Sequence, residues 1–126
     1  MELNYLPHQK SFLKPQAIIF DWDNTLVETW DVIGDALNKT LIAFGLAPWT
    51  VEEIRKRVHK SMRDSFPDLF GQDWECAARF FYKRYKEIHI EKLKVLPGAP
   101  VLLKRLAEMS IYLSVVSNKS GDILRS

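Results

Sequence analysis

Two carboxylates follow a short apolar segment near the start of the sequence. Residues 16–20 are mostly apolar and lead directly into Asp21 and Asp23, with Thr25 two positions further on. Such a segment predicts a β-strand that is buried on both faces. In open α/β sheets, ligands bind just beyond the carboxyl ends of the strands. Because two like charges held this close repel each other, the pair indicates a chemical site rather than a stabilising contact.

A second polar cluster follows another apolar segment. Residues 111–116 predict a strand, and Ser117, Asn118 and Lys119 come directly after it. If the two strands are parallel neighbours, the carboxylates and the hydroxyl lie at the same edge of one sheet. Carboxylates can act as nucleophiles or transfer protons, and a hydroxyl can donate a hydrogen bond to a bound ligand.

These two segments resemble the first and second motifs of the haloacid dehalogenase superfamily. The first motif, Asp-x-Asp-x-Thr after an apolar strand, matches Asp21, Asp23 and Thr25, and the second, a Ser or Thr at the next strand tip, matches Ser117. The resemblance covers the sequence from residue 16 onward. It implies an α/β fold, with a Rossmannoid parallel sheet and an inserted helical cap. It also implies a phosphoglycolate phosphatase-like enzyme that hydrolyses a small phosphorylated metabolite.

The resemblance gives each matched residue an expected role. Asp21 is expected to be the nucleophile that becomes an aspartyl phosphate, and Asp23 the general acid and base. The Asp21 side chain and the Asp23 backbone carbonyl are expected to bind Mg²⁺. Ser117, Asn118 and Thr25 are expected to bind the phosphate or to brace the loops around it. An acid at position 23 favours phosphatase or phosphomutase chemistry over dehalogenation.

The segment between the two motifs predicts three helices. Helical periodicity covers residues 28–44, and Thr50 with Glu53 forms a capping box that begins a second helix. Residues 67–71 are expected to break the pattern, and Asp73 to cap the third helix. Their apolar stripes require a common core, which predicts a small helical bundle. The stripe residues are Ile33, Leu37, Leu41 and Phe44 in the first helix and Trp74, Ala78, Phe81, Tyr85 and Ile88 in the third.

The predicted domain division follows from this helical insertion. Residues 29–96 are expected to form the cap, and residues 1–28 and 97–126 part of the core. The second helix carries a basic face, which is interpreted as solvated, with attraction of anionic substrates as the alternative. The residues of this face are Arg55, Lys56, Lys60 and Arg63.

Composition indicates an ordinary globular protein. The 126 residues are 47% hydrophobic and 27% charged, and the net charge is only +2, so we expect no nucleic-acid or membrane partner. The presence of a single cysteine, Cys76, fits a reducing, cytoplasmic location. Its side chain is expected to be small and buried.

The sequence lacks the later motifs of the superfamily. A third-motif Lys and a fourth-motif acidic pair would lie beyond Ser126, and Lys119 follows Ser117 too closely to replace that Lys. We therefore expect an N-terminal part of a phosphatase that is weakly active or inactive alone. A missing C-terminal segment or a partner chain would complete its core.

Three other interpretations stay open at this point. The chain is a non-catalytic remnant or a partner-dependent module in the first, and an RNA-binding helical module in the second. In the third, Asp21 and Asp23 are a solvated turn, because Asp favours turns.

Overall fold

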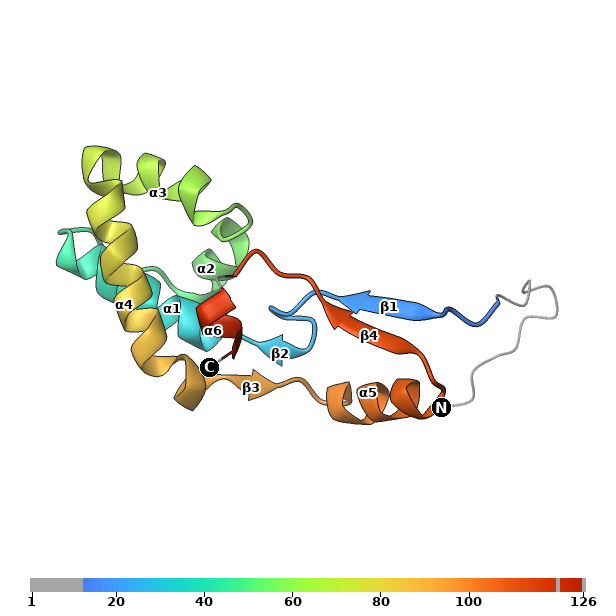
Figure 1. Ribbon diagram of the computed structural model, residues 1–126. Helices are drawn as coiled ribbons and strands as arrows, with labels where there is room; N and C mark the ends of the chain where they lie inside the picture. The colour runs from blue at the N-terminus through green and yellow to red at the C-terminus, as the bar shows by residue number, and fades with distance from the viewer. Residues whose placement is uncertain (1–12, 120, 126) are drawn as a thin grey trace.

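The computed structural model describes residues 13–119 and 121–125, so residues 1–12 of the predicted core lie outside the described part. Two strands extend to one side of the molecule and four helices gather at the other (Figure 1). The strands are β1 (Ala17–Phe20) and β4 (Tyr112–Val115). The four helices are α1 (Trp30–Ala43), α2 (Val51–Arg57), α3 (Met62–Phe70) and α4 (Trp74–Lys92).

Strands β1 and β4 pair in parallel, as the two motifs predicted. Phe20 is in register with Val115, and the amide of Val116 donates a 2.9 Å hydrogen bond to the Phe20 carbonyl. The expectation that β1 is buried on both faces is wrong, because Ile19 is 66% exposed and Tyr112 on β4 is 81% exposed. Within the described residues each strand has one neighbouring strand, and helix α5 (Ala99–Glu108) packs against β4.

The helical segment contains four α-helices rather than the three expected. The capping box of α2 is confirmed, but the helix ends at Arg57, and α3 starts after Ser61 and continues through Pro67. The Ser61 carbonyl accepts the Asp64 and Ser65 amides, which nucleates this separate helix. A 3₁₀ turn, η1 (Gly71–Asp73), leads into α4, and a short α6 (Gly121–Arg125) follows β4.

The helices share one hydrophobic core. The apolar stripe predicted for α4 is confirmed, because Phe81, Tyr85 and Ile88 are buried. Ala36 on α1 and Ala77 on α4 are fully buried, and such small side chains let the two helices approach closely. The core cluster consists of Val32, Ala36, Leu37, Leu41, Ile54, Phe66, Ala77, Phe81, Tyr85 and Ile88. We call this set the helical core.

A second, two-stranded sheet joins the helices to the rest of the chain. Strand β2 (Val27–Glu28) pairs antiparallel with β3 (Lys94–Val95), and the Leu96 amide extends the ladder with a 3.0 Å bond to the Leu26 carbonyl. The entry and exit segments of the helical insertion are thus hydrogen-bonded to each other.

Two further observations concern the surface of the described part. Cys76 is exposed on α4 instead of buried, and its Sγ accepts a 3.0 Å hydrogen bond from Arg79. No described helix has both the length and the apolar character that a membrane crossing requires.

Candidate active site

The first motif forms a tight turn between β1 and β2. The Trp22 carbonyl accepts three amide hydrogen bonds at 3.1–3.4 Å, from Thr25, Leu26 and Val27. Asn24 occupies the left-handed region with φ of +55°, which Asn tolerates better than most residues. Its Oδ1 accepts a 3.0 Å bond from the Thr29 amide, directly before α1. The turn is therefore fixed at both ends, and Asp21 and Asp23 lie within it.

The second motif forms a turn at the neighbouring strand end. Ser117 Oγ accepts a 3.1 Å hydrogen bond from the Lys119 amide. A hydroxyl has one donor in addition to its acceptor lone pairs, so Ser117 can still donate to a phosphate oxygen. The parallel register sets Asp21 and Ser117 just beyond adjacent strand ends, on the same edge of the sheet.

Lys119 connects this edge to the helices. Its Nζ lies 2.5 Å from Asp23 Oδ1 and 2.5 Å from the hydroxyl oxygen of Tyr85 on α4. Burial lowers the pKa of Lys119, but the hydrogen bonds to Asp23 and Tyr85 outweigh burial and raise it overall. Lys119 is therefore a cation at neutral pH.

Burial and the charge of Lys119 also shift the pKa values of Tyr85 and His89. Burial raises the pKa of Tyr85, and the Lys119 hydrogen bond opposes this rise only in part. Burial, followed by the charge of Lys119, lowers the pKa of His89. At neutral pH Tyr85 is a phenol and His89 a neutral imidazole.

A cavity of about 730 Å³ lies between the two turns and the helices. Asp23, Asn118 and Lys119 line it from the turns. Asp21 and Thr25 are exposed beside this lining rather than part of it. The structure thus gathers the predicted residues at one edge, and their catalytic and binding roles stay predictions.

The helical side of the cavity combines apolar and aromatic side chains with three basic ones. Arg57, Lys60 and Arg63 line it, together with Ser61 and Ser65. Arg57 is engaged already, since its guanidinium lies 4.8 Å from the Trp49 ring centroid. Within residues 13–119 and 121–125, neither Lys60 nor Arg63 forms an ion pair. The prediction that one helix carries the whole basic face is wrong, because α2 ends at Arg57. Lys60 lies between α2 and α3 and Arg63 on α3, and both line the cavity.

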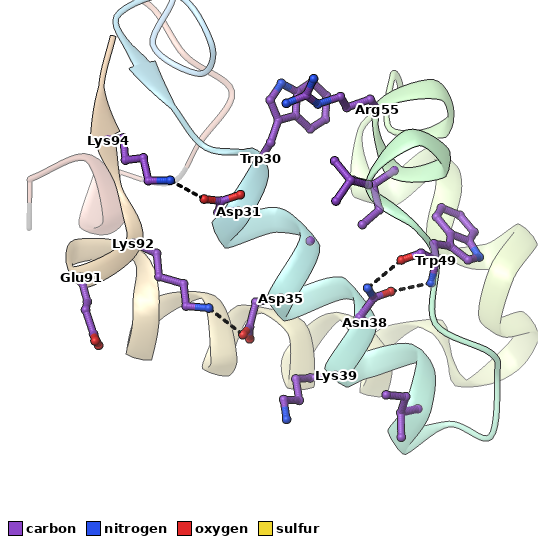
Figure 2. Close-up of a pocket in the computed structure, with 14 residues that line it drawn as sticks. Trp30, Asp31, Asp35, Asn38, Lys39, Trp49, Arg55, Glu91, Lys92 and Lys94 are labelled. Carbon is purple, nitrogen blue, oxygen red and sulfur yellow. Dashed lines mark hydrogen bonds and ion pairs between the residues drawn. The ribbon is translucent and has the colours of Figure 1, made fainter. Parts of the chain in front are cut away.

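A second cavity, of about 620 Å³, lies against a different face of α1 (Figure 2). Its charged residues are largely paired with each other, with Lys94 2.8 Å from Asp31 and Lys92 3.0 Å from Asp35. The Asn38 side chain donates to and accepts from the Trp49 backbone at 2.9 and 2.7 Å. These contacts tie α1 to its neighbours, and neither Asp21 nor Asp23 lines this cavity.

The donor set near the first motif can form part of a magnesium site. Mg²⁺ in phosphoryl-transfer sites is often held by one or two carboxylates, with water and substrate phosphate as the remaining ligands. The exposed Asp21 carboxylate is available for this purpose. The described residues contain no cluster of three or more acidic, His or Cys side chains placed to hold a metal, so Asp21 and Asp23 would supply only part of the coordination.

Comparison with known proteins decides the family. A family model described as haloacid dehalogenase-like hydrolase matches residues 18–126. The chain belongs to this family. It is 31% identical over 114 residues to a phosphoglycolate phosphatase from Chromobacterium violaceum, covering 83% of this chain and 51% of the relative. It is 33% identical over 117 residues to another from Rhodospirillum rubrum, covering 83% and 48%.

A solved structure from the same family confirms the fold. The haloacid dehalogenase-like family protein from Streptococcus pneumoniae superimposes with a TM-score of 0.78 at 25% identity, covering 86% of this chain and 51% of that chain. The predicted α/β class with a helical insertion is therefore confirmed. The chain spans about half the length of the curated relatives it matches.

Sequence reasoning missed two residues of this site, Lys119 and Tyr85. From the sequence, Lys119 is only a residue too close to Ser117 to replace the third-motif Lys, and Tyr85 is only part of the apolar stripe of the third helix. The available signal for Lys119 was its position two residues after Ser117, at a strand end that faces the acids. Nothing in the sequence pairs Tyr85 with that turn.

Proposed function

We propose that this protein is a haloacid dehalogenase-type phosphomonoesterase that acts through an aspartyl phosphate on Asp21. The observation that carries the proposal is the parallel pairing of β1 with β4, which sets the acidic turn beside the Ser117 turn. The lining of the cavity next to this edge includes basic side chains, which a phosphate-ester site requires. The membership in the hydrolase family supports the same chemistry.

The side chains divide the work of hydrolysis. The Asp21 carboxylate attacks phosphorus, and Asp23 gives a proton to the leaving oxygen and later takes one from water. The Ser117 hydroxyl donates to a phosphoryl oxygen, with Asn118 beside it. We propose Mg²⁺ as the cofactor, held by the Asp21 side chain and the Asp23 carbonyl; when bound it supplies positive charge against the phosphoryl oxygens.

The cavity favours a small substrate that carries a second anionic group. Its volume of about 730 Å³ suits a metabolite, and Lys60 and Arg63 line it together with Asp23. Phosphoglycolate has a carboxylate in addition to its phosphate and therefore fits this charge pattern. Relatives that bear the name of phosphoglycolate phosphatase support this choice.

The exposed sheet indicates how the site is completed. Ile19 and Tyr112 are largely exposed, and so is Val101 on α5 at 71%. We propose that a further chain segment or a partner chain covers these side chains and adds the remaining phosphate and metal ligands. In this proposal residues 29–96 act as a cap over a partial core formed by residues 1–28 and 97–126.

The decisive experiment removes the nucleophile from the complete gene product. Hydrolysis of phosphoglycolate and of an aryl phosphate is measured with Mg²⁺ for the wild type and for Asp21→Asn. We expect kcat to fall on the order of a thousandfold or more. Asp68→Asn is the matched control, because Asp68 is exposed on α3 and lines neither cavity.

Two outcomes would count against the proposal. Activity that survives Asp21→Asn would remove the nucleophile assignment. A wild type without Mg²⁺-dependent turnover of any phosphate ester would favour the non-catalytic, partner-dependent module, which the exposed sheet also fits. We expect the 126-residue chain by itself to be weakly active at most.

A further inference from the structure

A largely buried ammonium group joins three segments that are far apart in the sequence. Asp23 lies in the turn after β1, Lys119 in the turn after β4, and Tyr85 on helix α4. Only 11% of the Lys119 side chain and 24% of the Asp23 side chain are exposed, and Tyr85 is 4% exposed. Through this nitrogen atom helix α4 is linked to the acidic turn.

The chemistry of Lys119 fixes the direction of both hydrogen bonds. An ammonium group donates and never accepts, so Asp23 Oδ1 and the Tyr85 oxygen are both acceptors. The Lys119 nitrogen lies 2.5 Å from that oxygen but 4.9 Å from the ring centroid. These two distances place it beyond the hydroxyl end of the ring, so the contact is a hydrogen bond rather than a cation–π interaction.

Asp23 is held by one oxygen only. Its Oδ1 accepts from Lys119, whereas Oδ2 forms no side-chain hydrogen bond with any residue that the structure describes. Asp23 also lines the 730 Å³ cavity. A general acid–base carboxylate must present one oxygen within hydrogen-bond reach of the reacting group. Anchoring Oδ1 leaves Oδ2 for that purpose.

Tyr85 is in turn fixed by the helical core. Its ring stacks on the His89 ring at a centroid distance of 5.8 Å and an interplanar angle of 19°. Phe81 packs against it at a centroid distance of 5.8 Å. The position of the Tyr85 hydroxyl is therefore set by the position of α4, which makes it a fixed reference point for Lys119.

An ion pair formed for stability alone does not account for this arrangement. Partly buried ion pairs contribute little net stability, because desolvation offsets their attraction. A hydroxyl on a third segment would add little to the stability that such a pair provides. It adds much to the precise orientation of a reactive carboxylate.

We propose that Lys119 and Tyr85 are positioning residues for Asp23. Lys119 fixes the carboxylate by Oδ1, and Tyr85 fixes Lys119 only while α4 lies against the turn at residues 117–119. The inference rests on the proposed phosphatase function and adds that the helical insertion aligns the acid–base group as well as covering the cavity.

The kinetic test uses the complete gene product with phosphoglycolate and an aryl phosphate. We expect Tyr85→Phe to lower kcat about tenfold, because it removes one hydrogen bond to a charged group, with KM changed less than twofold. Lys119→Gln should lower kcat further, and Lys119→Arg should restore part of the loss. Tyr112→Phe is the matched control, since Tyr112 is exposed on β4 and lines neither cavity.

The double variant separates positioning from a general structural role. If Tyr85 acts through Lys119, Tyr85→Phe has no further effect on kcat in the Lys119→Gln protein. Multiplicative losses, or losses confined to KM, would overturn the inference while leaving the phosphatase assignment intact.

A spectroscopic test is independent of turnover. In protein with ¹⁵N-labelled lysine, the shielded Lys119 ammonium should give a slowly exchanging NMR signal. We expect the signal to disappear in Asp23→Asn and Tyr85→Phe and to persist in Tyr112→Phe. An active wild type that lacks the signal would overturn this inference alone. A protected signal in a protein without phosphatase turnover would overturn the proposed function instead.

Discussion

The helices and the β1–β4 sheet use apolar residues in opposite ways. In the helices, large side chains such as Leu41 and Phe81 are buried at 1% and 7% exposure. In the sheet, Ile19 and Tyr112 are exposed at 66% and 81%. The two regions also divide the proposed chemistry, since the sheet edge supplies the acids and the helical insertion supplies Lys60, between α2 and α3, and Arg63 on α3.

The described chain packs the helical insertion by itself. The β1–β4 sheet, in contrast, needs a further surface to cover its apolar side chains. The helical insertion contains a core of its own, whereas among the described residues the β1–β4 sheet consists of one pair of strands, with helix α5 packed against β4. Parallel sheets are normally covered on both faces. Four measurements test this contrast between the helices and the sheet.

The largest effect is expected for Phe81→Ala in the 126-residue chain. Removing this ring from the helical core should lower the free energy of unfolding by about 3–5 kcal/mol. Ile19→Ala on the exposed sheet face should change it by less than about 0.5 kcal/mol. Urea unfolding followed by circular dichroism measures both. Equal losses would mean that the sheet is already packed in this chain.

The second measurement tests the division of charge between the two regions. In the complete gene product, Lys60→Ala combined with Arg63→Ala should raise KM for phosphoglycolate about tenfold, which corresponds to about 1.4 kcal/mol of binding free energy. KM for an aryl phosphate without a second anionic group should change little. An equal rise for both substrates would show that these residues attract anions without recognising the second group.

The third measurement concerns an ion-pair cluster between helices α1 and α4. Arg84 Nε lies 2.8 Å from Asp35 Oδ1 and Lys92 Nζ lies 3.0 Å from Asp35 Oδ2. The hydrogen bond from Arg84 is the main cause of the lowered pKa of Asp35, with Lys92 adding to it, although burial opposes the shift. A lowered folded-state pKa stabilises the fold above the unfolded value of about 3.8, and this contribution is lost as pH falls further.

Asp35→Asn tests this linkage. The variant should unfold at a lower urea concentration than the wild type at pH 7, by less than Phe81→Ala does. The difference should shrink as pH falls below about 4, because the wild-type carboxylate is then protonated as well. A difference that stays constant across this range would mean that charge on Asp35 contributes nothing.

The smallest effect is expected at Thr29, where the helices join β2. Thr29 is fully buried, and its Oγ1 has no hydrogen-bond partner in the described part of the chain. A buried hydroxyl without a partner costs free energy, so Thr29→Val should be neutral or should stabilise by up to about 1 kcal/mol. A clear loss of stability would show that the hydroxyl is satisfied in solution.

Much of the helical region could be predicted from its sequence period. Phe81, Tyr85 and Ile88 recur at helical spacing and are buried as expected. On α1 the expected stripe included Ile33, but the buried face shifts toward Val32 and Ala36. The reason is that Ala is small rather than strongly apolar, so periodicity underrates it, although close helix packing selects it.

The two short strands and one contact of the site could not be predicted from the sequence. Strands β2 and β3 contain two residues each, too few to produce an alternating pattern. The acids and Ser117 carry a motif, and their shared edge follows from parallel pairing. The Lys119–Tyr85 contact depends on how α4 is oriented, which tertiary packing decides and local sequence does not.

The β2–β3 pair has a consequence for how the protein could be remodelled. Glu28 and Lys94 are register partners, so the helical insertion leaves and rejoins the sheet at one point in space. A two-residue hairpin turn is long enough to close such a gap. The entire insertion could thus be deleted, or exchanged for another with equally close ends, without lengthening or redirecting the strands that carry the acids.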